Sequence, residues 1–160
     1  MASAIQVEKF LAALKQHRIP FMAVGVSAAA LQGANVFTND FDIWLEKLEF
    51  FKLANIAKDA GGVALFTEWH GVQVHLPEET AIDVVLSVTG LDSFRAAWKR
   101  AQRVCLGRTE IKALDLADIV KSKEALGREK DIRTLPQLKD FLRLRDARNK
   151  ARRRPKKRRS

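Results

Sequence analysis

The sequence predicts one domain of the α/β (α+β) class, and two features of its pattern carry that prediction. Apolar residues recur at helical spacing near the start of the chain, where Val7, Phe10, Leu11 and Leu14 follow the i, i+3, i+4, i+7 rule. Short apolar runs such as FMAVG at residues 21–25 separate the helical segments and are typical of strands. The chain of 160 residues, 47% of them hydrophobic, is long enough to bury a sizeable core.

The expected elements alternate along the chain and end in a pair of helices. We expect helices over residues 4–17, 27–32, 48–60, from 92 or 93 to about 102, 115–131 and 134–149. We expect strands over residues 21–25, 40–45, 63–66, 71–76, 81–87, 103–106 and 109–114. Asp115 is predicted to cap the helix that it begins, because its side chain can accept a backbone N–H there. Pro136 falls in the first turn predicted for the last helix, where proline is tolerated.

Positive charge is concentrated at the end of the chain. The net charge is +10, and the segment from Arg143 onward holds eleven Lys and Arg residues but one acid, Asp146, so residues 1–142 are neutral. We therefore predict a folded domain over residues 1–149. Residues 150–160, KARRRPKKRRS, hold one apolar residue, Ala151, and are predicted to be a disordered basic tail.

A basic run of this kind attracts polyanions through counterion release. RNA, including tRNA, is the expected partner of the basic tail 143–160. Nuclear localisation, contact with anionic lipid and improved solubility are the alternatives. The chain has no Tyr, and we expect no exposed aromatic cluster, which argues against a dedicated platform for stacking bases.

Several classes of protein are disfavoured by the composition. No apolar run approaches the roughly 18–20 residues that a membrane span needs. The first residues, MASAIQVEKF, lack the basic and apolar regions of a secretory signal, so we expect a cytoplasmic protein. The single cysteine, Cys105, excludes an internal disulfide, and its apolar surroundings predict that it is buried.

Three aspartates are the main candidates for chemistry. Asp40 and Asp42 are two residues apart in a predicted strand, so their side chains point to the same face. Neighbouring carboxylates raise each other's pKa unless a cation joins them, and oxygen ligands suit Mg²⁺ or Mn²⁺. Asp83 occupies a second apolar strand, AIDVVLS. Together the three aspartates indicate phosphoryl or nucleotidyl transfer that uses two metal ions.

A glycine turn precedes the aspartates and suggests a phosphate site. The strand 21–25 leads through Gly25 into a helix whose first N–H groups and positive dipole end suit an anion. An ordinary tight turn is the alternative interpretation. Trp44 could stack on a base, but its place in the strand favours burial. His70 and His75 lack a second histidine at metal-binding spacing, and we do not expect them to be ligands.

The order of these motifs resembles that of the nucleotidyltransferase superfamily, and of its minimal and AbiEii-type members in particular. The resemblance covers roughly residues 20–140: a glycine turn, a small helix, T-x-D-x-D at 38–42, then Asp83 in an apolar strand. It implies a small mixed sheet with helices packed on it. It also implies metal-dependent transfer of a nucleoside monophosphate from an NTP to a hydroxyl, with release of pyrophosphate. The hydroxyl could belong to RNA, tRNA or protein.

The resemblance implies a role for each matching residue. Asp40, Asp42 and Asp83 would be catalytic and hold the metal. The residues that would contact nucleotide or phosphate are Gly25, Val26, Ser27, Thr38, Lys123 and Arg128.

Lys123 and Arg128 belong to a second motif, in which relatives have a lysine, an arginine and then Lys-Asp. Both could instead lie on a solvated helix face with ordinary i,i+4 pairing. Lys130 and Asp131 complete the motif, and we expect them to tie helices together.

Two positions depart from the family pattern. Val26 replaces a second glycine or a serine after Gly25, and its β-branched side chain restricts the backbone. Val36 stands where many relatives have an arginine. These departures support an alternative, an RNA-binding module with the same fold and weakened catalysis. A further alternative is a toxin–antitoxin or defence component that acts through a protein partner.

Overall fold

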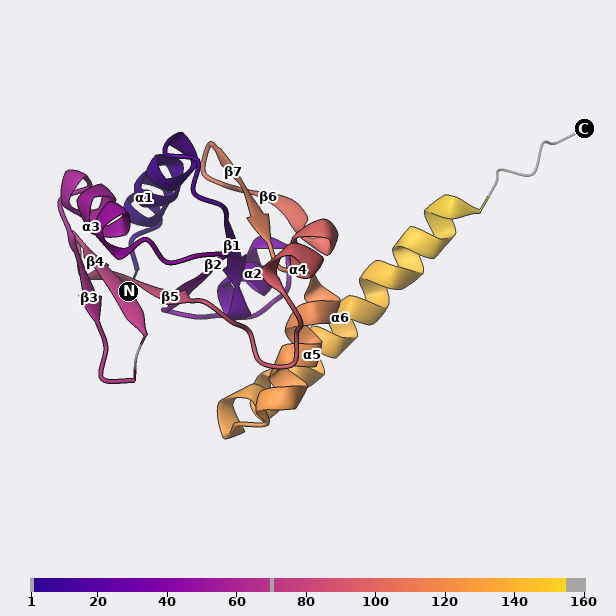
Figure 1. Cartoon of the computed structure of the whole chain (residues 1–160). Coiled ribbons are helices and arrows are strands. Elements are labelled where there is room, and N and C mark those ends of the chain that lie inside the picture. Colours follow the sequence, from indigo (N-terminus) through magenta and orange to yellow (C-terminus); the bar gives the residue numbers. More distant parts are fainter. Residues whose placement is uncertain (1, 70, 155–160) are drawn as a thin grey trace, which may run out of the picture.

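A mixed β-sheet organises the chain (Figure 1). The structure is a computed structural model that describes residues 2–69 and 71–154. Within this part, the sheet has seven strands in the order β3-β4-β5-β2-β1-β7-β6. The strands are β1 (Phe21–Val24), β2 (Phe41–Leu45), β3 (Val63–Phe66), β4 (Val72–Leu76), β5 (Thr80–Val85), β6 (Gln102–Leu106) and β7 (Thr109–Ala113). The mixed sheet expected from the sequence is confirmed.

The helices connect and cover these strands. They are α1 (Ala4–Gln16), α2 (Gly25–Leu31), α3 (Phe50–Asp59), α4 (Phe94–Arg100), α5 (Leu116–Leu126) and α6 (Glu129–Arg153). The apolar stripe of α1 is buried as its spacing predicts. The predicted cap forms, because Asp115 accepts a hydrogen bond from the Ala117 N–H. Ser93 caps α4 in the same way and accepts a hydrogen bond from the Ala96 N–H.

Strand β2 lies at the centre of the sheet and sets the positions of the aspartates. It pairs antiparallel with β1 and parallel with β5. Ile43, Trp44 and Leu45 are buried, so the strand is covered on both faces. The Trp44 ring packs edge-on against Phe94 at 5.5 Å between centroids, which confirms its interpretation as a core residue.

The C-terminal helical pair is present, but its boundaries differ from those predicted. Helix α5 ends at Gly127, whose φ of 59° is left-handed and stops the helix. Arg128 then caps α6, which begins at Glu129. The predicted helix 115–131 is therefore two helices. Pro136 lies inside α6 and not in its first turn.

Helix α6 is also longer than expected and extends away from the sheet (Figure 1). Residues 150–153, which the sequence assigned to a disordered tail, are helical, because Ala, Lys and Arg all favour the helix. Residues 155–160 of that tail lie outside the described residues. None of the described helices combines the length and the apolar character that a membrane crossing requires.

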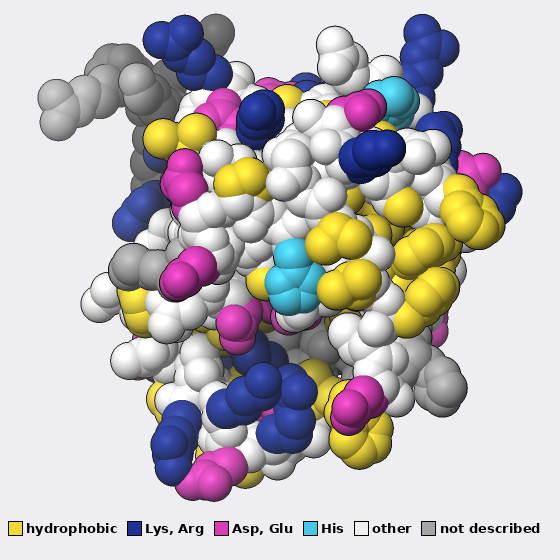
Figure 2. All heavy atoms as spheres, turned by 90° about the vertical axis from the view of Figure 1, so that its left-hand side faces the viewer, with side chains coloured by type: hydrophobic (Ala, Val, Ile, Leu, Met, Phe, Trp, Pro, Cys, Tyr) yellow, Lys and Arg dark blue, Asp and Glu magenta, His cyan; other side chains and the backbone are white. Residues whose placement is uncertain are grey.

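Two expectations about burial are wrong. Cys105 is exposed, because β6 is the last strand of the sheet and this position faces outward. An exposed aromatic cluster is present at the opposite edge, where the rings of Phe50 and Phe66 stack at 4.3 Å and Phe51 is 83% exposed. Hydrophobic side chains gather on this face in Figure 2. The cluster forms because α3 brings its aromatic residues beside β3.

Candidate active site

A cavity of about 620 Å³ brings distant parts of the chain together beside the start of β2. Its size suits a small molecule such as a nucleotide. Most of the predicted site residues line it: Gly25, Val26, Thr38, Asp40, Asp42, Asp83, Lys123 and Arg128. Lys130, which was expected to tie helices together, lines it as well.

Asp42 and Asp83 lie directly beside each other across the parallel strands β2 and β5. Gln73 on β4 faces Asp83 from the other side, and its Nε2–H donates a hydrogen bond of 2.6 Å to Asp83 Oδ1. Sequence reasoning missed Gln73, although its place between two apolar residues in GVQVHL put it on the opposite face from its neighbours. Gln73 thus fixes the orientation of one of the two paired carboxylates.

Burial and like charge shift the ionisation of Asp42. Loss of hydration, followed by the nearby charges of Asp83 and Asp40, raises the pKa of Asp42 to about 6. The positive charge of Lys130 opposes this shift. A carboxylate pair held this way favours a cation, because a cation between them removes the repulsion.

The donor set fits a divalent cation in part. Asp42 and Asp83 supply paired oxygen donors, the chemistry that Mg²⁺ and Mn²⁺ prefer. In the described part of the chain, however, no three His, Cys, Asp or Glu side chains are already grouped to hold a metal ion. Asp40 is exposed at the cavity rim, where Thr38 Oγ1 accepts a hydrogen bond of 3.0 Å from its backbone N–H. Asp40 must turn toward Asp42 to act as a third ligand.

The glycine at position 25 has two structural reasons. Its φ of 66° is left-handed, a conformation that favours glycine. A Cβ atom at this position would also lie 2.9 Å from Asp42 Oδ2. The turn that opens α2 therefore lies directly against the carboxylate, which places the turn and the aspartates in one site.

Ser27 does not lie where the sequence placed it. Its side chain is 5% exposed, and its hydroxyl donates a hydrogen bond of 3.0 Å to the Val24 carbonyl. Among the described residues, those that line the cavity include Val24, Gly25 and Val26 but not Ser27. The hydroxyl stabilises the start of α2, because such local bonds satisfy backbone groups at helix ends.

Lys123 and Arg128 share one buried partner. Lys123 Nζ lies 2.9 Å from Asp131 Oδ1, and Arg128 Nε lies 2.6 Å from Asp131 Oδ2. Burial would raise the pKa of Asp131, but hydrogen bonds from Arg128 and Lys123, together with their charges, outweigh it and lower the pKa to about 2. Asp131 therefore ties α5 to α6, as expected. Lys123 and Arg128 line the cavity while they are bound to Asp131.

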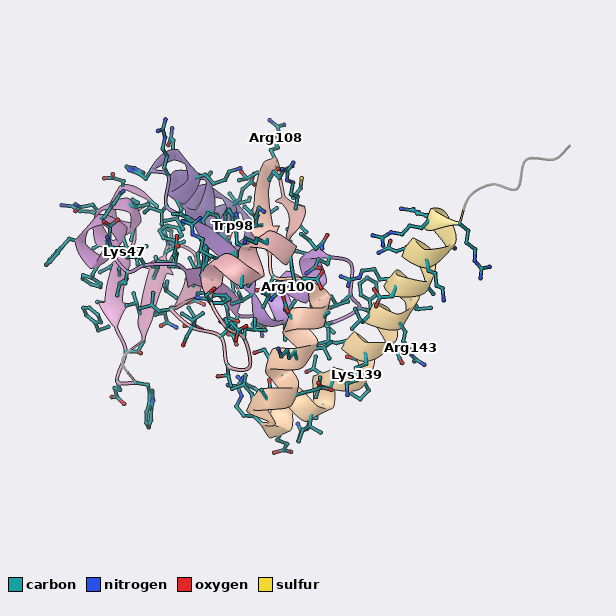
Figure 3. The ribbon with its side chains drawn as sticks, turned by 45° about the vertical axis from the view of Figure 1, so that its right-hand side comes forward. Lys47, Trp98, Arg100, Arg108, Lys139 and Arg143 are labelled. Atoms are coloured by element: carbon teal, nitrogen blue, oxygen red, sulfur yellow. The ribbon has the colours of Figure 1, made fainter. Side chains whose placement is uncertain are left out.

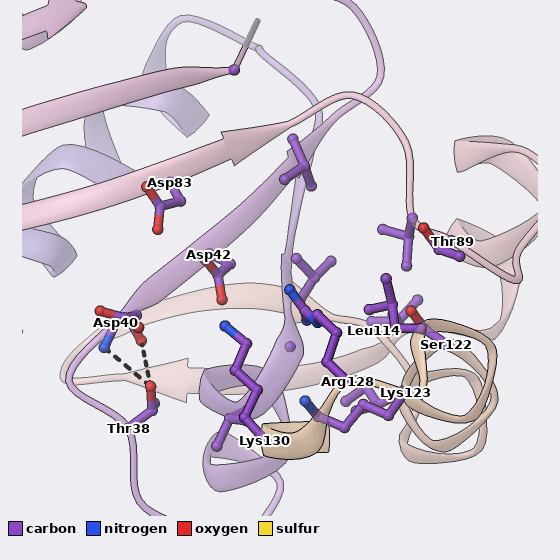
Figure 4. A pocket seen from close by; sticks show the side chains of 18 of the residues that line it. Thr38, Asp40, Asp42, Asp83, Thr89, Leu114, Ser122, Lys123, Arg128 and Lys130 are labelled. Carbon is purple, nitrogen blue, oxygen red and sulfur yellow. Dashed lines mark hydrogen bonds between the residues drawn. The ribbon is translucent and has the colours of Figure 1, made fainter. Parts of the chain in front are cut away.

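Lys130 has a different role from the one expected. Figure 4 shows its ammonium group pointing toward Asp40 and Asp42. Within the described residues it makes no ion pair of the kind that holds Lys123, and its charge lowers the pKa of Asp42. Consecutive residues on a helix point about 100° apart. Asp131 therefore faces α5 while Lys130 faces the cavity.

The remaining candidates lie away from this arrangement. His75 is exposed on β4 and is not among the cavity residues. His70 lies outside the described residues. Glu78 and Glu79 are exposed turn residues.

Comparisons with known proteins identify the fold. No protein-family model matches the chain, and no curated protein matches its sequence. Among solved structures, the chain is similar to the antibiotic-resistance factor ANT(2'')-Ia in solution, with a TM-score of 0.61 and 15% identity over 93% of this chain and 95% of that one. A crystal structure of ANT(2'')-Ia in complex with adenylyl-2''-tobramycin gives a TM-score of 0.61 and 14% identity, over 87% of this chain and 88% of that one.

A third structure points the same way. A protein of Thermotoga maritima assigned as a nucleotidyltransferase gives a TM-score of 0.61 and 18% identity over 84% of this chain and 91% of that one. At such identities the likeness establishes the fold, so the chain has the fold of the nucleotidyltransferases. The closer likeness to the minimal and AbiEii-type members stays a prediction.

Proposed function

We propose that the protein is a metal-dependent nucleotidyltransferase, which moves a nucleoside monophosphate from an NTP to a hydroxyl and releases pyrophosphate. The observation that carries this proposal is the pairing of Asp42 with Asp83 across two parallel strands, with the Gly25 turn against Asp42. The neighbours' shared fold supports it.

The three aspartates would hold the metal. Asp42 and Asp83 supply the paired donors, and Asp40 joins them when its exposed side chain turns inward. Mg²⁺ or Mn²⁺ bound there would neutralise phosphate charge and orient the leaving group. The hydrogen bond from Gln73 keeps one Asp83 oxygen in place and leaves the other without that bond.

Asp83 would also receive the acceptor's proton. The acceptor oxygen forms a bond to the α-phosphorus, and the bond from that phosphorus to the bridging oxygen breaks. Pyrophosphate leaves with the bond's electron pair. The proton of the acceptor hydroxyl passes to the Asp83 carboxylate, a general base of the kind that acts in such transfers.

Lys130 is the cation best placed for the triphosphate. Its ammonium group faces the cavity, whereas Lys123 and Arg128 remain bound to Asp131. A cation aimed at developing negative charge stabilises the transition state of phosphoryl transfer. The backbone of Gly25 and Val26 and the Thr38 hydroxyl complete the phosphate-binding wall of the cavity.

The test is transfer of label from each α-labelled NTP, with Mg²⁺ or Mn²⁺, to RNA, protein and small hydroxyl compounds. The small compounds are included because the neighbour ANT(2'')-Ia was crystallised with adenylyl-2''-tobramycin. Asp42→Asn should abolish labelled product. Asp59→Asn, an exposed carboxylate outside the cavity, should leave it unchanged. Equal transfer by wild type and Asp42→Asn would contradict the proposed site.

One observation favours a second function, an RNA-binding module without turnover. Val26 lines the cavity where relatives have a smaller residue, and Lys123 and Arg128 are already ion-paired with Asp131. This alternative predicts RNA binding that neither Mg²⁺ nor NTP alters, and no labelled product with any NTP.

A further inference from the structure

The last turns of α6 differ from the rest of the helix in how their charges are paired. From Arg133 to Asp146, the basic side chains of α6 pair with acids, as in Arg133–Glu129, Lys139–Glu124 and Arg143–Asp140. After Asp146 the sequence holds no acidic residue. We name residues 147–154 the basic arm; its cations are Arg148, Lys150, Arg152, Arg153 and Arg154. None of them has an ion-pair partner among the described residues.

The cations of the basic arm lie on opposite sides of the helix. Arg148 and Arg152 are four residues apart and share one face, whereas Lys150 and Arg153 share another. Residues two apart point about 200° from each other, so the two faces are nearly opposite. Like charges at these spacings destabilise a helix, and anions on both sides would relieve that repulsion.

We propose that the basic arm binds RNA and holds it as the acceptor of the nucleotidyl group; the second half of this inference rests on the proposed function. The arm has only Ala147 and Ala151 as apolar residues, so it lacks the apolar face that a membrane-binding helix needs. Cations on opposite faces suit a polyanion whose phosphates can pass along both sides of the helix, as those of a flexible single-stranded RNA can.

The arm and the cavity are joined by one rigid element. Figure 3 shows α6 carrying Lys139 and Arg143 progressively away from the sheet. At about 1.5 Å per residue, the 18 residues from Lys130 to Arg148 span about 27 Å, and Arg154 is about 36 Å from Lys130. At about 3.4 Å per nucleotide of a stacked strand, this distance equals about 8–11 nucleotides. An RNA held by the arm reaches the cavity only if it is at least that long.

The chemical step at the cavity is the proposed nucleotidyl transfer. A hydroxyl oxygen of the RNA would bond to the α-phosphorus, pyrophosphate would leave, and the proton would pass to Asp83. The arm takes no part in this step. It raises the local concentration of long RNA at the site, as a second binding element does.

The first experiment measures binding without turnover. A fluorescent single-stranded RNA of about 20 nucleotides is titrated with the full chain at 50–300 mM salt. The arm variant changes four cations to glutamine: Arg148→Gln, Lys150→Gln, Arg152→Gln and Arg153→Gln. The control variant removes four exposed cations elsewhere: Lys58→Gln, Lys99→Gln, Arg103→Gln and Arg108→Gln. Circular dichroism of each variant checks that the fold is retained.

The arm variant should lose affinity more than about tenfold at low salt, and the slope of log K against log salt should fall by about 3, since each phosphate contact contributes about 0.7–0.9. The control variant should bind within about twofold of wild type, because its four cations lie outside the arm. Equal loss in both variants would overturn the proposal. Duplex DNA or anionic vesicles bound as tightly as RNA would overturn the choice of RNA.

The second experiment separates the arm from the active site. Label transfer is measured to RNA of 4, 8, 12 and 20 nucleotides. The arm variant should match wild type on the shortest RNA and lose activity on RNA longer than about 10 nucleotides. Equal transfer at every length would overturn the acceptor role. If wild type labels no RNA while binding depends on the arm, the acceptor role is overturned and RNA binding by the arm stands. Label transfer to protein or small hydroxyl compounds then decides the proposed function separately.

Discussion

The three aspartates of the cavity and the five cations of the basic arm are two groups of like charges. Asp42 is largely removed from water, so repulsion from Asp83 and Asp40 adds to the cost of burial and raises the pKa of Asp42 to about 6. The cations of the arm are exposed, where water and salt screen each charge. Burial thus favours one specific cation in the cavity, and exposure favours salt-sensitive binding of a polyanion on the arm.

Asp131 offers a third case, in which buried charge is fully paired. Asp131→Asn should lower the free energy of unfolding by about 3–5 kcal/mol, because it leaves Lys123 buried without its partner. Glu129→Gln, which removes the exposed pair with Arg133, should change it by less than about 1 kcal/mol. Urea unfolding at pH 7 measures both. Losses of unfolding free energy below about 1 kcal/mol in both variants would contradict a stabilising role for the buried Asp131 pairs.

Lys130 is the test of charge complementarity within the cavity. Lys130→Gln should lower kcat/KM for nucleotidyl transfer by about 10- to 100-fold, because it removes the unpaired cation that faces the phosphates. Lys121→Gln removes an exposed cation from neighbouring α5 and should have no effect. Steady-state kinetics with the preferred NTP distinguishes them. An active Lys130→Gln variant would return the role to Lys123 or Arg128.

The raised pKa of Asp42 also predicts how stability depends on pH. Between pH 3.8 and about 6 the folded protein holds a proton on Asp42 that the unfolded chain has lost. The contribution of Asp42 to stability therefore falls as pH rises through this window, by up to about 1.4 kcal/mol per pH unit for one proton. Asp42→Asn should remove this slope. Urea unfolding from pH 4 to pH 8 without metal provides the comparison, and equal slopes would contradict the burial of charge.

The sequence predicted the acidic side of the site better than the basic side. Asp42 and Asp83 each occupy an apolar strand, and such strands pair by a regular register. The roles of Lys130 and Asp131 depend on where α6 begins. Because α5 ends at Gly127, α6 begins at Glu129, several residues earlier than predicted. This early start directs Lys130 toward the cavity.

Other residues could not be placed because they depend on contacts distant in sequence. Gln73 acts through the β4–β5 register, and Cys105 is exposed because β6 is an edge strand. The aromatic cluster arises where α3 meets β3, and neither segment alone shows it. The helical pattern was informative wherever an apolar stripe was present. Residues 150–153 have no stripe, so their helix could not be recognised.

The most direct test of the account is calorimetric titration of Mn²⁺ into the protein at pH 7.5, with a non-hydrolysable NTP present. Wild type should bind the ion with an affinity that changes little between 50 and 300 mM salt and falls below about pH 6, where Asp42 takes up a proton. Asp42→Asn should lose this binding, while Asp59→Asn should keep it. Equal Mn²⁺ affinity in wild type and Asp42→Asn would contradict the assignment of the paired carboxylates as the metal site.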